Sequence, residues 1–129
     1  MPGLSENRSA LILFAHGARD PEWAQPFIKI QRQVRSILPA AAVELAFLEI
    51  MEPRLPQTIE KLVREGHTRI TIAPLFMAQG GHLKHDLPKI LDAFRAGHPA
   101  IELNLLPAVG DAEPVLKAIS QWLVAAMRI

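Results

Sequence analysis

The chain has 129 residues, with 14 lysines and arginines against 13 aspartates and glutamates, and half of its residues are apolar. This length and composition suit one soluble globular domain, and the near-neutral charge argues against nucleic-acid and anionic-membrane partners. The absence of cysteine excludes disulfides, thiolate zinc sites and cysteine-ligated iron–sulfur clusters, so any metal must be held by imidazole, carboxylate, backbone or water.

The first nine residues, MPGLSENRS, are polar, and we expect an N-terminal tail over residues 1–9 and one domain over residues 10–129. This opening lacks the apolar segment of a secretory signal. No later run approaches the ~20 apolar residues that a membrane span needs. The sequence therefore predicts a cytoplasmic protein without a membrane partner.

Strand-like and helix-like apolar patterns alternate four times along the chain. Continuous or alternating apolar runs predict strands at residues 10–15, 43–48, 69–76 and 101–106. Apolar residues at three- and four-residue spacing predict a helix after each strand. The inward-facing positions are expected to be, in chain order, Trp23, Phe27, Ile30, Val34 and Ile37; Leu55, Ile59, Leu62 and Val63; Leu87, Ile90, Leu91 and Phe94; and Val115, Ile119, Trp122 and Leu123.

Short polar residues and glycines mark the expected helix ends. Asp20, Asp86 and Asp111 are candidate N-caps of the first, third and fourth helices, because an aspartate side chain can accept hydrogen bonds from the free backbone N–H groups there. Gly66 and Gly97 are expected to stop the second and third helices.

Four consecutive β–α units predict a parallel sheet with right-handed crossovers and helices on both faces. The first and third strands are largely apolar, which places them at the centre of the sheet. The second and fourth strands contain polar residues (Glu44, Glu102 and Asn104), which places them at the edges. We therefore expect an α/β fold with a single open four-stranded sheet in the order 2-1-3-4.

Ligands of open α/β sheets bind beyond the carboxyl ends of the strands, where the strand order reverses. Here that point lies between the first and third strands, which are followed by His16 and His82, and the second strand brings Glu49 and Glu52 to the same edge. Taken alone, each histidine also fits an ordinary turn or solvated loop, and Glu52 fits a charge at a helix N-terminus. The two histidines at one crevice together favour a functional site.

Two imidazoles with a nearby carboxylate suit a borderline divalent ion such as Co²⁺, Ni²⁺ or Fe²⁺. Imidazole also titrates near physiological pH, so the same group can accept a proton. Other α/β chemistries fit less well, because the chain has no G-x-S-x-G, G-x-x-x-x-G-K-[ST] or G-x-G-x-x-G motif. A histidine phosphatase carries an arginine before its His-Gly pair, and Ala15 stands there instead.

Three blocks of sequence carry a resemblance to a known family: LILFAHGARDP, AFLEIMEPRLPQTIEKL and PLFMAQGGHLKHDLP. In this order and spacing they resemble the small class II chelatases of the sirohydrochlorin cobaltochelatase type, from about Ala10 to Ala125. Ala15 and Ala18 stand where that family commonly has glycine and serine. His85 stands where a charged residue is more common, and it is either a further ligand or a solvated side chain.

The resemblance implies a chelatase that inserts a divalent metal into sirohydrochlorin during cobalamin synthesis, without an organic cofactor. Co²⁺ is the expected metal. Insertion of Fe²⁺ or Ni²⁺ is the nearest alternative, and a non-catalytic metal or tetrapyrrole carrier is the alternative of another class. It also implies a homodimer, because small members are about half the length of chelatases in which two such domains are fused.

The resemblance also assigns roles to individual residues. It implies that His16 and His82 bind the metal and act in catalysis, with His16 also the proton acceptor. The residues that it places against the tetrapyrrole are Glu52, Met77, Ala78, Gln79, Gly80, Gly81 and His82. The candidates by position for binding the substrate's carboxylates are Arg19, Arg54 and Lys84.

Overall fold

The computed structural model describes residues 8–128, with the backbone alone for His82. Residues 1–7 of the expected tail lie outside this range, whereas Ser9 already belongs to the first strand. The elements, in chain order, are β1 (Ser9–Ala15), η1 (Pro21–Ala24), α2 (Gln25–Ile37), β2 (Ala42–Phe47), α3 (Leu55–Arg64), β3 (Arg69–Pro74), α4 (Gly81–Gly97), β4 (Glu102–Leu105), η2 (Val109–Asp111) and α5 (Glu113–Ala126).

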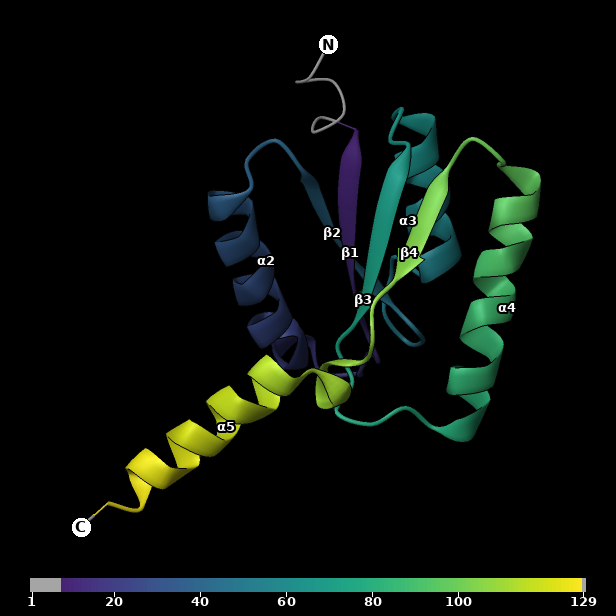
Figure 1. Ribbon diagram of the computed structural model, residues 1–129. Helices are drawn as coiled ribbons and strands as arrows, with labels where there is room; N and C mark the ends of the chain where they lie inside the picture. The colour runs from purple at the N-terminus through teal and green to yellow at the C-terminus, as the bar shows by residue number, and fades with distance from the viewer. Residues whose placement is uncertain (1–7, 129) are drawn as a thin grey trace.

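The four strands form one parallel sheet in the order β2-β1-β3-β4, which confirms the predicted topology. Helices α3 and α4 cover one face of the sheet, α2 covers part of the other, and α5 runs outward from the end of the sheet (Figure 1). No helix within residues 8–128 is long and apolar enough to cross a membrane.

The main core lies between the sheet and the helices α3 and α4. Alternate residues of the central strands point into it, because successive side chains of a strand face opposite sides of the sheet. Ile12 of β1 and Ile72 of β3 are fully buried there. The helices contribute their apolar stripes, and the residues so packed include Leu55, Ile59, Leu62, Leu87 and Leu91.

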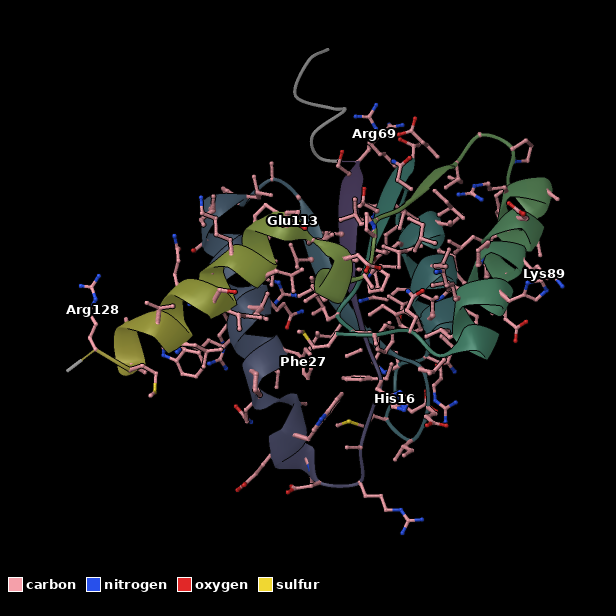
Figure 2. All side chains as sticks on the ribbon, turned by 60° about the horizontal axis from the view of Figure 1, so that its bottom comes forward. His16, Phe27, Arg69, Lys89, Glu113 and Arg128 are labelled. Carbon is pink, nitrogen blue, oxygen red and sulfur yellow. The ribbon has the colours of Figure 1, made fainter. Side chains whose placement is uncertain are left out.

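The amino and carboxyl ends of the strands carry different polar residues. Figure 2 shows Arg69 and His16 at opposite ends of the central strands. Arg69 begins β3 and its Nε lies 2.9 Å from Glu102 Oε2 at the start of β4, so an ion pair joins these strands at their amino ends. His16 follows β1 at the carboxyl edge. The carboxyl edge is therefore the place for the expected ligand site.

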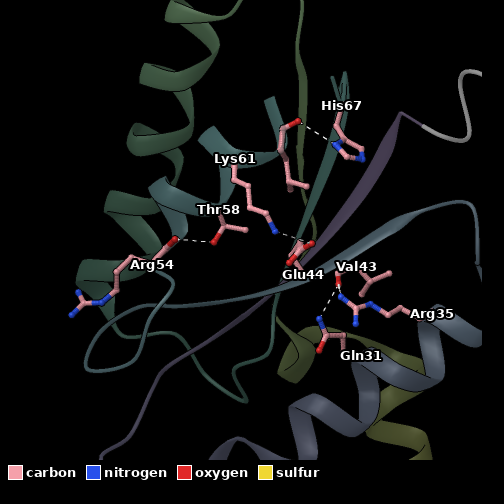
Figure 3. A network of polar contacts seen from close by, with 9 residues as sticks. Gln31, Arg35, Val43, Glu44, Arg54, Thr58, Lys61 and His67 are labelled. Atoms are coloured by element: carbon pink, nitrogen blue, oxygen red, sulfur yellow. Dashed lines mark hydrogen bonds and ion pairs between the residues drawn. The ribbon is translucent and has the colours of Figure 1, made fainter. Parts of the chain in front are cut away.

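Polar side chains also protect the outer strand. Gln31 Nε2 and Arg35 of α2 donate to the carbonyl oxygen of Val43 in β2 at 2.8 and 2.7 Å (Figure 3). On the opposite face, Lys61 Nζ of α3 lies 3.4 Å from Glu44 Oε1. An edge strand exposes unpaired backbone groups, and the two bonds from α2 satisfy the carbonyl group of Val43. Together with the contact of Lys61, they connect helices on both faces of the sheet to β2.

Two predicted helix starts are wrong. Helix α4 begins at Gly81 with Gly80 as its N-cap, so Asp86 lies inside the helix. Gly80 is extended, and its carbonyl accepts from Lys84 N at 3.0 Å, which places the N-cap six residues earlier than expected. Asp111 is not the N-cap of α5, because Asp111 N bonds to Ala108 O in the turn η2 and Ala112 takes the cap position.

Two other expected helix ends are confirmed. Asp20 caps the short helix η1, with Oδ1 accepting from Glu22 N at 2.9 Å. Gly66 follows the C-cap of α3 with φ +90°, the left-handed conformation in which glycine carries no steric penalty.

Candidate functional site

Loops from all four strands meet at the carboxyl edge of the sheet and are joined there by backbone hydrogen bonds. Glu49 N, after β2, donates to His16 O, after β1, at 3.1 Å. Gly110 N, in the turn after β4, donates to Phe76 O, after β3, at 3.0 Å. The backbones of the loops after β1 and β2, and of those after β3 and β4, are therefore held together in pairs.

At the centre of this edge, the imidazole of His16 meets the carboxylate of Glu49. His16 Nε2 lies 3.3 Å from Glu49 Oε1, and both side chains are about half exposed. The ring of Phe76 meets the His16 ring edge to face, with 6.1 Å between centroids. The pair thus has an apolar wall on one side and access from solvent on the other.

The backbone conformation around this pair restricts which residues can occupy the neighbouring positions. Gly17 has φ +98°, and a Cβ there would overlap the carbonyl oxygen of Glu49, so only glycine allows the two loops to approach so closely. Ile50 has φ +71°, and Met51 N bonds to Glu49 O at 2.7 Å, which closes a γ-turn around Ile50. Such a turn is strained for a β-branched residue, and Glu49 is its first residue.

A cavity of about 360 Å³ opens between α3 and α4, beside the ends of β1 and β2. This volume is within the range of small-ligand pockets. Its wall is apolar except for Arg54, whose Nε donates to Met51 O at 3.2 Å. Figure 3 shows the Arg54 carbonyl bonded to Thr58 while the guanidinium extends away from α3. The lining residues are Phe14, Phe47, Leu48, Arg54, Leu55, Pro56, Leu83, Leu87 and Ile90.

The residues that the resemblance placed against a tetrapyrrole lie near the carboxyl edge of the sheet, but they do not all gather around His16. Met77 is largely exposed in the loop after β3, as are Ala78 and Gly80, whereas Gln79 is half-buried. Gly80 and Gly81 do not adopt a positive φ, and a methyl group on either would meet nothing within 4 Å. Open space beside their backbone is compatible with a flat ligand, but the fold itself does not require glycine at either position.

The acidic and basic candidates are also at or near the surface. The Glu52 side chain is 67% exposed, and its Oε1 lies 4.0 Å from Arg54 Nε, so it neighbours Arg54 rather than His16. Arg19 and Lys84 are exposed and His85 lies exposed within α4. The side chain of His82 lies outside the described part of the structure, although its backbone belongs to the first turn of α4.

Glu49 is the site residue that sequence reasoning underrated. It was placed at the same edge as Glu52, but only Glu52 entered the expected site. The sequence feature that indicated Glu49 was its position two residues after the end of β2, the strand next to β1. Glu52 lies further along the same loop. Among the described side chains no three histidines, aspartates or glutamates form a metal cluster, and His16 and Glu49 form a contact of two such side chains only.

Comparison with known proteins agrees with the fold. The family model described as CbiX matches residues 10–126, which is nearly the whole chain. The chain belongs to the CbiX family. A solved structure of the CbiX protein from Marinobacter aquaeolei superimposes with a TM-score of 0.77 at 27% identity, covering 92% of this chain and 97% of that one.

Other relatives carry names that include a metal. The sirohydrochlorin cobaltochelatase of Methanococcus aeolicus is 39% identical over 82 residues, 64% of this chain and 57% of the relative. The sirohydrochlorin ferrochelatase of Bacillus subtilis is 26% identical over 112 residues, 87% of this chain and 43% of the relative. This CbiX-family chain thus spans about half the length of these relatives.

A second solved structure was obtained with a metal. It is the sirohydrochlorin chelatase SirB from Bacillus subtilis subspecies spizizenii in complex with cobalt, and it superimposes with a TM-score of 0.74 at 26% identity. The match covers 92% of this chain and 50% of that chain.

Proposed function

We propose that this protein is a cytoplasmic chelatase that inserts a divalent metal into sirohydrochlorin. The observation that carries the proposal is the contact between His16 Nε2 and Glu49 Oε1, at 3.3 Å, at the strand-order switch point of a CbiX-family sheet. An imidazole and a carboxylate suit borderline divalent ions and leave coordination positions open for a second ligand.

The proposed reaction exchanges the metal ion for two protons. As the ion enters the ring, two pyrrole N–H bonds break, and the electron pairs of the nitrogens form bonds to the metal. His16 binds the ion and then accepts a proton from the ring, while Glu49 stabilises the charge on the imidazole. A half-exposed pair allows the protons to leave to solvent, and His82 is proposed as a second metal ligand.

The cavity between α3 and α4 is the proposed place for an edge of the macrocycle. Its apolar wall suits a flat ring, and the guanidinium of Arg54 suits one of the eight carboxylates that sirohydrochlorin carries. Glu52 and the residues Met77 to Gly81 are proposed to border the ring at the mouth of the site, where Met77 offers an exposed apolar surface.

Cobalt is the proposed metal, which would place the reaction in cobalamin synthesis. Relatives of this chain are named for cobalt and for iron, so insertion of Fe²⁺ for sirohaem is the second candidate, with Ni²⁺ the third. Ligand type does not choose among them, because the affinity of an imidazole–carboxylate site rises steadily from Fe²⁺ through Co²⁺ to Ni²⁺. Rates for the three metals, measured side by side, assign the preference.

Turnover distinguishes a chelatase from a carrier. Purified protein at one-hundredth of the concentration of sirohydrochlorin is mixed with Co²⁺, Ni²⁺ or Fe²⁺, and the absorption spectrum of the metallated ring is followed. We expect conversion of many equivalents of sirohydrochlorin for at least one metal, well above the protein-free rate. Conversion limited to one equivalent would indicate a carrier, and no acceleration with any metal would refute the proposed function.

The two histidines of α4 provide a test of the proposed ligand set. His82→Ala is expected to abolish turnover, because it removes the second metal ligand. His85→Ala is expected to retain most of the activity, because His85 is exposed within the helix. The reverse pattern would assign the ligand role to His85.

We also propose that the protein is a homodimer. The matched solved chain of the Bacillus enzyme is about twice as long, since this chain covers 50% of it. A pair of these domains would have a comparable size. Sedimentation velocity of the full chain at micromolar concentration is expected to give the mass of two copies, and a monomer would contradict the proposal.

A further inference from the structure

The imidazole of His16 is only partly fixed by the loops that surround it. Its backbone is held by the hydrogen bond from Glu49 N to His16 O and by the close approach of the two loops at Gly17. The side chain itself is 55% exposed, and its Nε2 meets the equally exposed carboxylate of Glu49. The χ2 torsion of a histidine is broad, so a fixed backbone does not determine the plane of the ring. The orientation of the imidazole therefore depends on what lies beside it.

The ring of Phe76 lies beside the imidazole. The centroids of the two rings are 6.1 Å apart, and the ring planes cross at 86°. This is the edge-to-face geometry that aromatic pairs prefer at separations of about 4.5–7 Å. Rotation of the imidazole about χ2 changes the angle between the rings and also moves Nε2 relative to the Glu49 carboxylate. The contacts with Phe76 and Glu49 together therefore define one orientation of the His16 ring.

Phe76 is itself held in place by the core and by two backbone hydrogen bonds. Its side chain is 9% exposed and meets the ring of the fully buried Phe14 edge to face, with 5.5 Å between centroids. Leu75 N donates to Phe14 O at 2.8 Å, and Gly110 N donates to Phe76 O at 3.0 Å. A Cβ on Gly110 would overlap the carbonyl of Met77, so the turn η2 lies directly against this loop. A ring of the core thus extends to the carboxyl edge of the sheet.

We propose that Phe76 is a positioning residue, which fixes the plane of the His16 imidazole for the entry of the metal. The inference rests on the proposed function and adds to it a side chain that acts through His16. The lone pair of an imidazole nitrogen lies in the plane of the ring, so the orientation of that plane decides where the nitrogen can bind an ion or accept a proton. A displacement of about 1 Å at a reacting group can cost ~100-fold in rate.

A second pair of a phenylalanine and a histidine provides a matched control. Phe94 stacks on His98, also with 6.1 Å between ring centroids, and Phe94 is half-buried against the core. His98 is the C-cap of α4 and precedes β4, so this pair lies near the amino ends of the strands. Removal of either phenylalanine ring costs a similar contact, but only Phe76 borders the candidate site.

Steady-state kinetics compares full-length Phe76→Leu and Phe76→Met with Phe94→Leu, at saturating Co²⁺ and varied sirohydrochlorin. Leucine and methionine keep an apolar side chain in the core but remove the ring. We expect both Phe76 variants to lower kcat at least tenfold and to leave KM for sirohydrochlorin within twofold, because the ring lies in the core. Phe94→Leu is expected to unfold at lower denaturant concentration without a change in kcat. A rise in KM, an unchanged kcat in the Phe76 variants, or an equal fall of kcat in Phe94→Leu would overturn the inference.

Nuclear Overhauser effects in the metal-free protein test the orientation of the imidazole without turnover. In the wild type and in Phe94→Leu we expect one effect between the rings of His16 and Phe76 and another between the His16 ring and the Glu49 side chain. The second effect should fall at least twofold in both Phe76 variants. Absence of the first effect from the wild type, or an unchanged second effect in the variants, would overturn the inference. A wild type without turnover for Co²⁺, Ni²⁺ or Fe²⁺ would refute the proposed function, whereas these effects would still decide whether Phe76 orients the ring.

Discussion

The imidazole of His16 and the carboxylate of Glu49 are held together by the backbone more than by their mutual attraction. A polar contact between side chains as exposed as these contributes only about 0–1 kcal/mol. By contrast, the bond from Glu49 N to His16 O, the close approach at Gly17 and the turn at Ile50 each restrict the loops that carry the two groups. The pair is therefore positioned by the fold itself.

Replacement of Gly17 tests this positioning. Gly17→Ala combines a strained positive φ with a collision against the Glu49 carbonyl, whereas Gly66→Ala has the strain without any neighbour within 4 Å. Gly66→Ala should lower the free energy of unfolding by about 1–2 kcal/mol. Gly17→Ala should lower it further and also slow metal insertion, because Glu49 must move. Denaturant titrations and insertion rates measure both, and equal effects of the two variants would contradict the account.

Arg54 provides a test of substrate binding at the same scale. Arg54→Ala removes the cation at the wall of the cavity and should raise KM for sirohydrochlorin about tenfold with little change in kcat, since the interaction is made equally in the ground state and the transition state. Arg64→Ala, at the far end of α3, is the control and should leave both constants unchanged. A fall in kcat alone would mean that Arg54 acts on the reaction itself.

Helix α4 links the core of the molecule to the candidate site. Its first turn begins at the carboxyl edge of the sheet, and its later turns bury Leu87 and Leu91 against the sheet. The position of the first turn therefore depends on how well the rest of the helix packs.

Adjacent residues of α4 allow this packing to be measured. Leu91 is fully buried, whereas Ile90 is 39% exposed. Leu91→Ala should destabilise the protein by about 2–5 kcal/mol, because it leaves a cavity in the core. Ile90→Ala should cost less than about 1.5 kcal/mol. Denaturant unfolding of both variants provides the comparison, and a larger effect at Ile90 would contradict the described packing.

The errors in element boundaries have a common physical origin. Asp86 and Asp111 are good N-cap residues, but Gly80 and Ala112 adopt the extended conformation that precedes each helix. At Gly80 no side chain is available to accept a hydrogen bond, so the choice of cap depends on where the chain leaves the sheet. Cap propensity alone contributes ~1 kcal/mol and is overridden by such constraints.

At the scale of the whole molecule, periodicity was sufficient to predict the sheet. The contrast between buried strands such as β1 and the polar alternation of β4 correctly predicted the strand order, and the order placed His16 at the switch point. The place of Glu49 close to the end of β2 was a signal for its role, but the contact of its side chain with His16 also depends on a positive φ at Ile50, which no sequence pattern indicated. The outward course of α5 could not be predicted either, since its apolar stripe is compatible with packing in the same chain or in another.

The initial rate of Co²⁺ insertion into sirohydrochlorin, measured for the wild type and for His16→Ala, tests the central claim most directly. The His16 side chain is 55% exposed, so its removal should leave the fold intact, as circular dichroism will verify. Loss of a metal ligand that also accepts a proton should slow insertion at least ~100-fold. The account predicts a fast wild type and a variant close to the protein-free rate. Equal rates for the two proteins would contradict it.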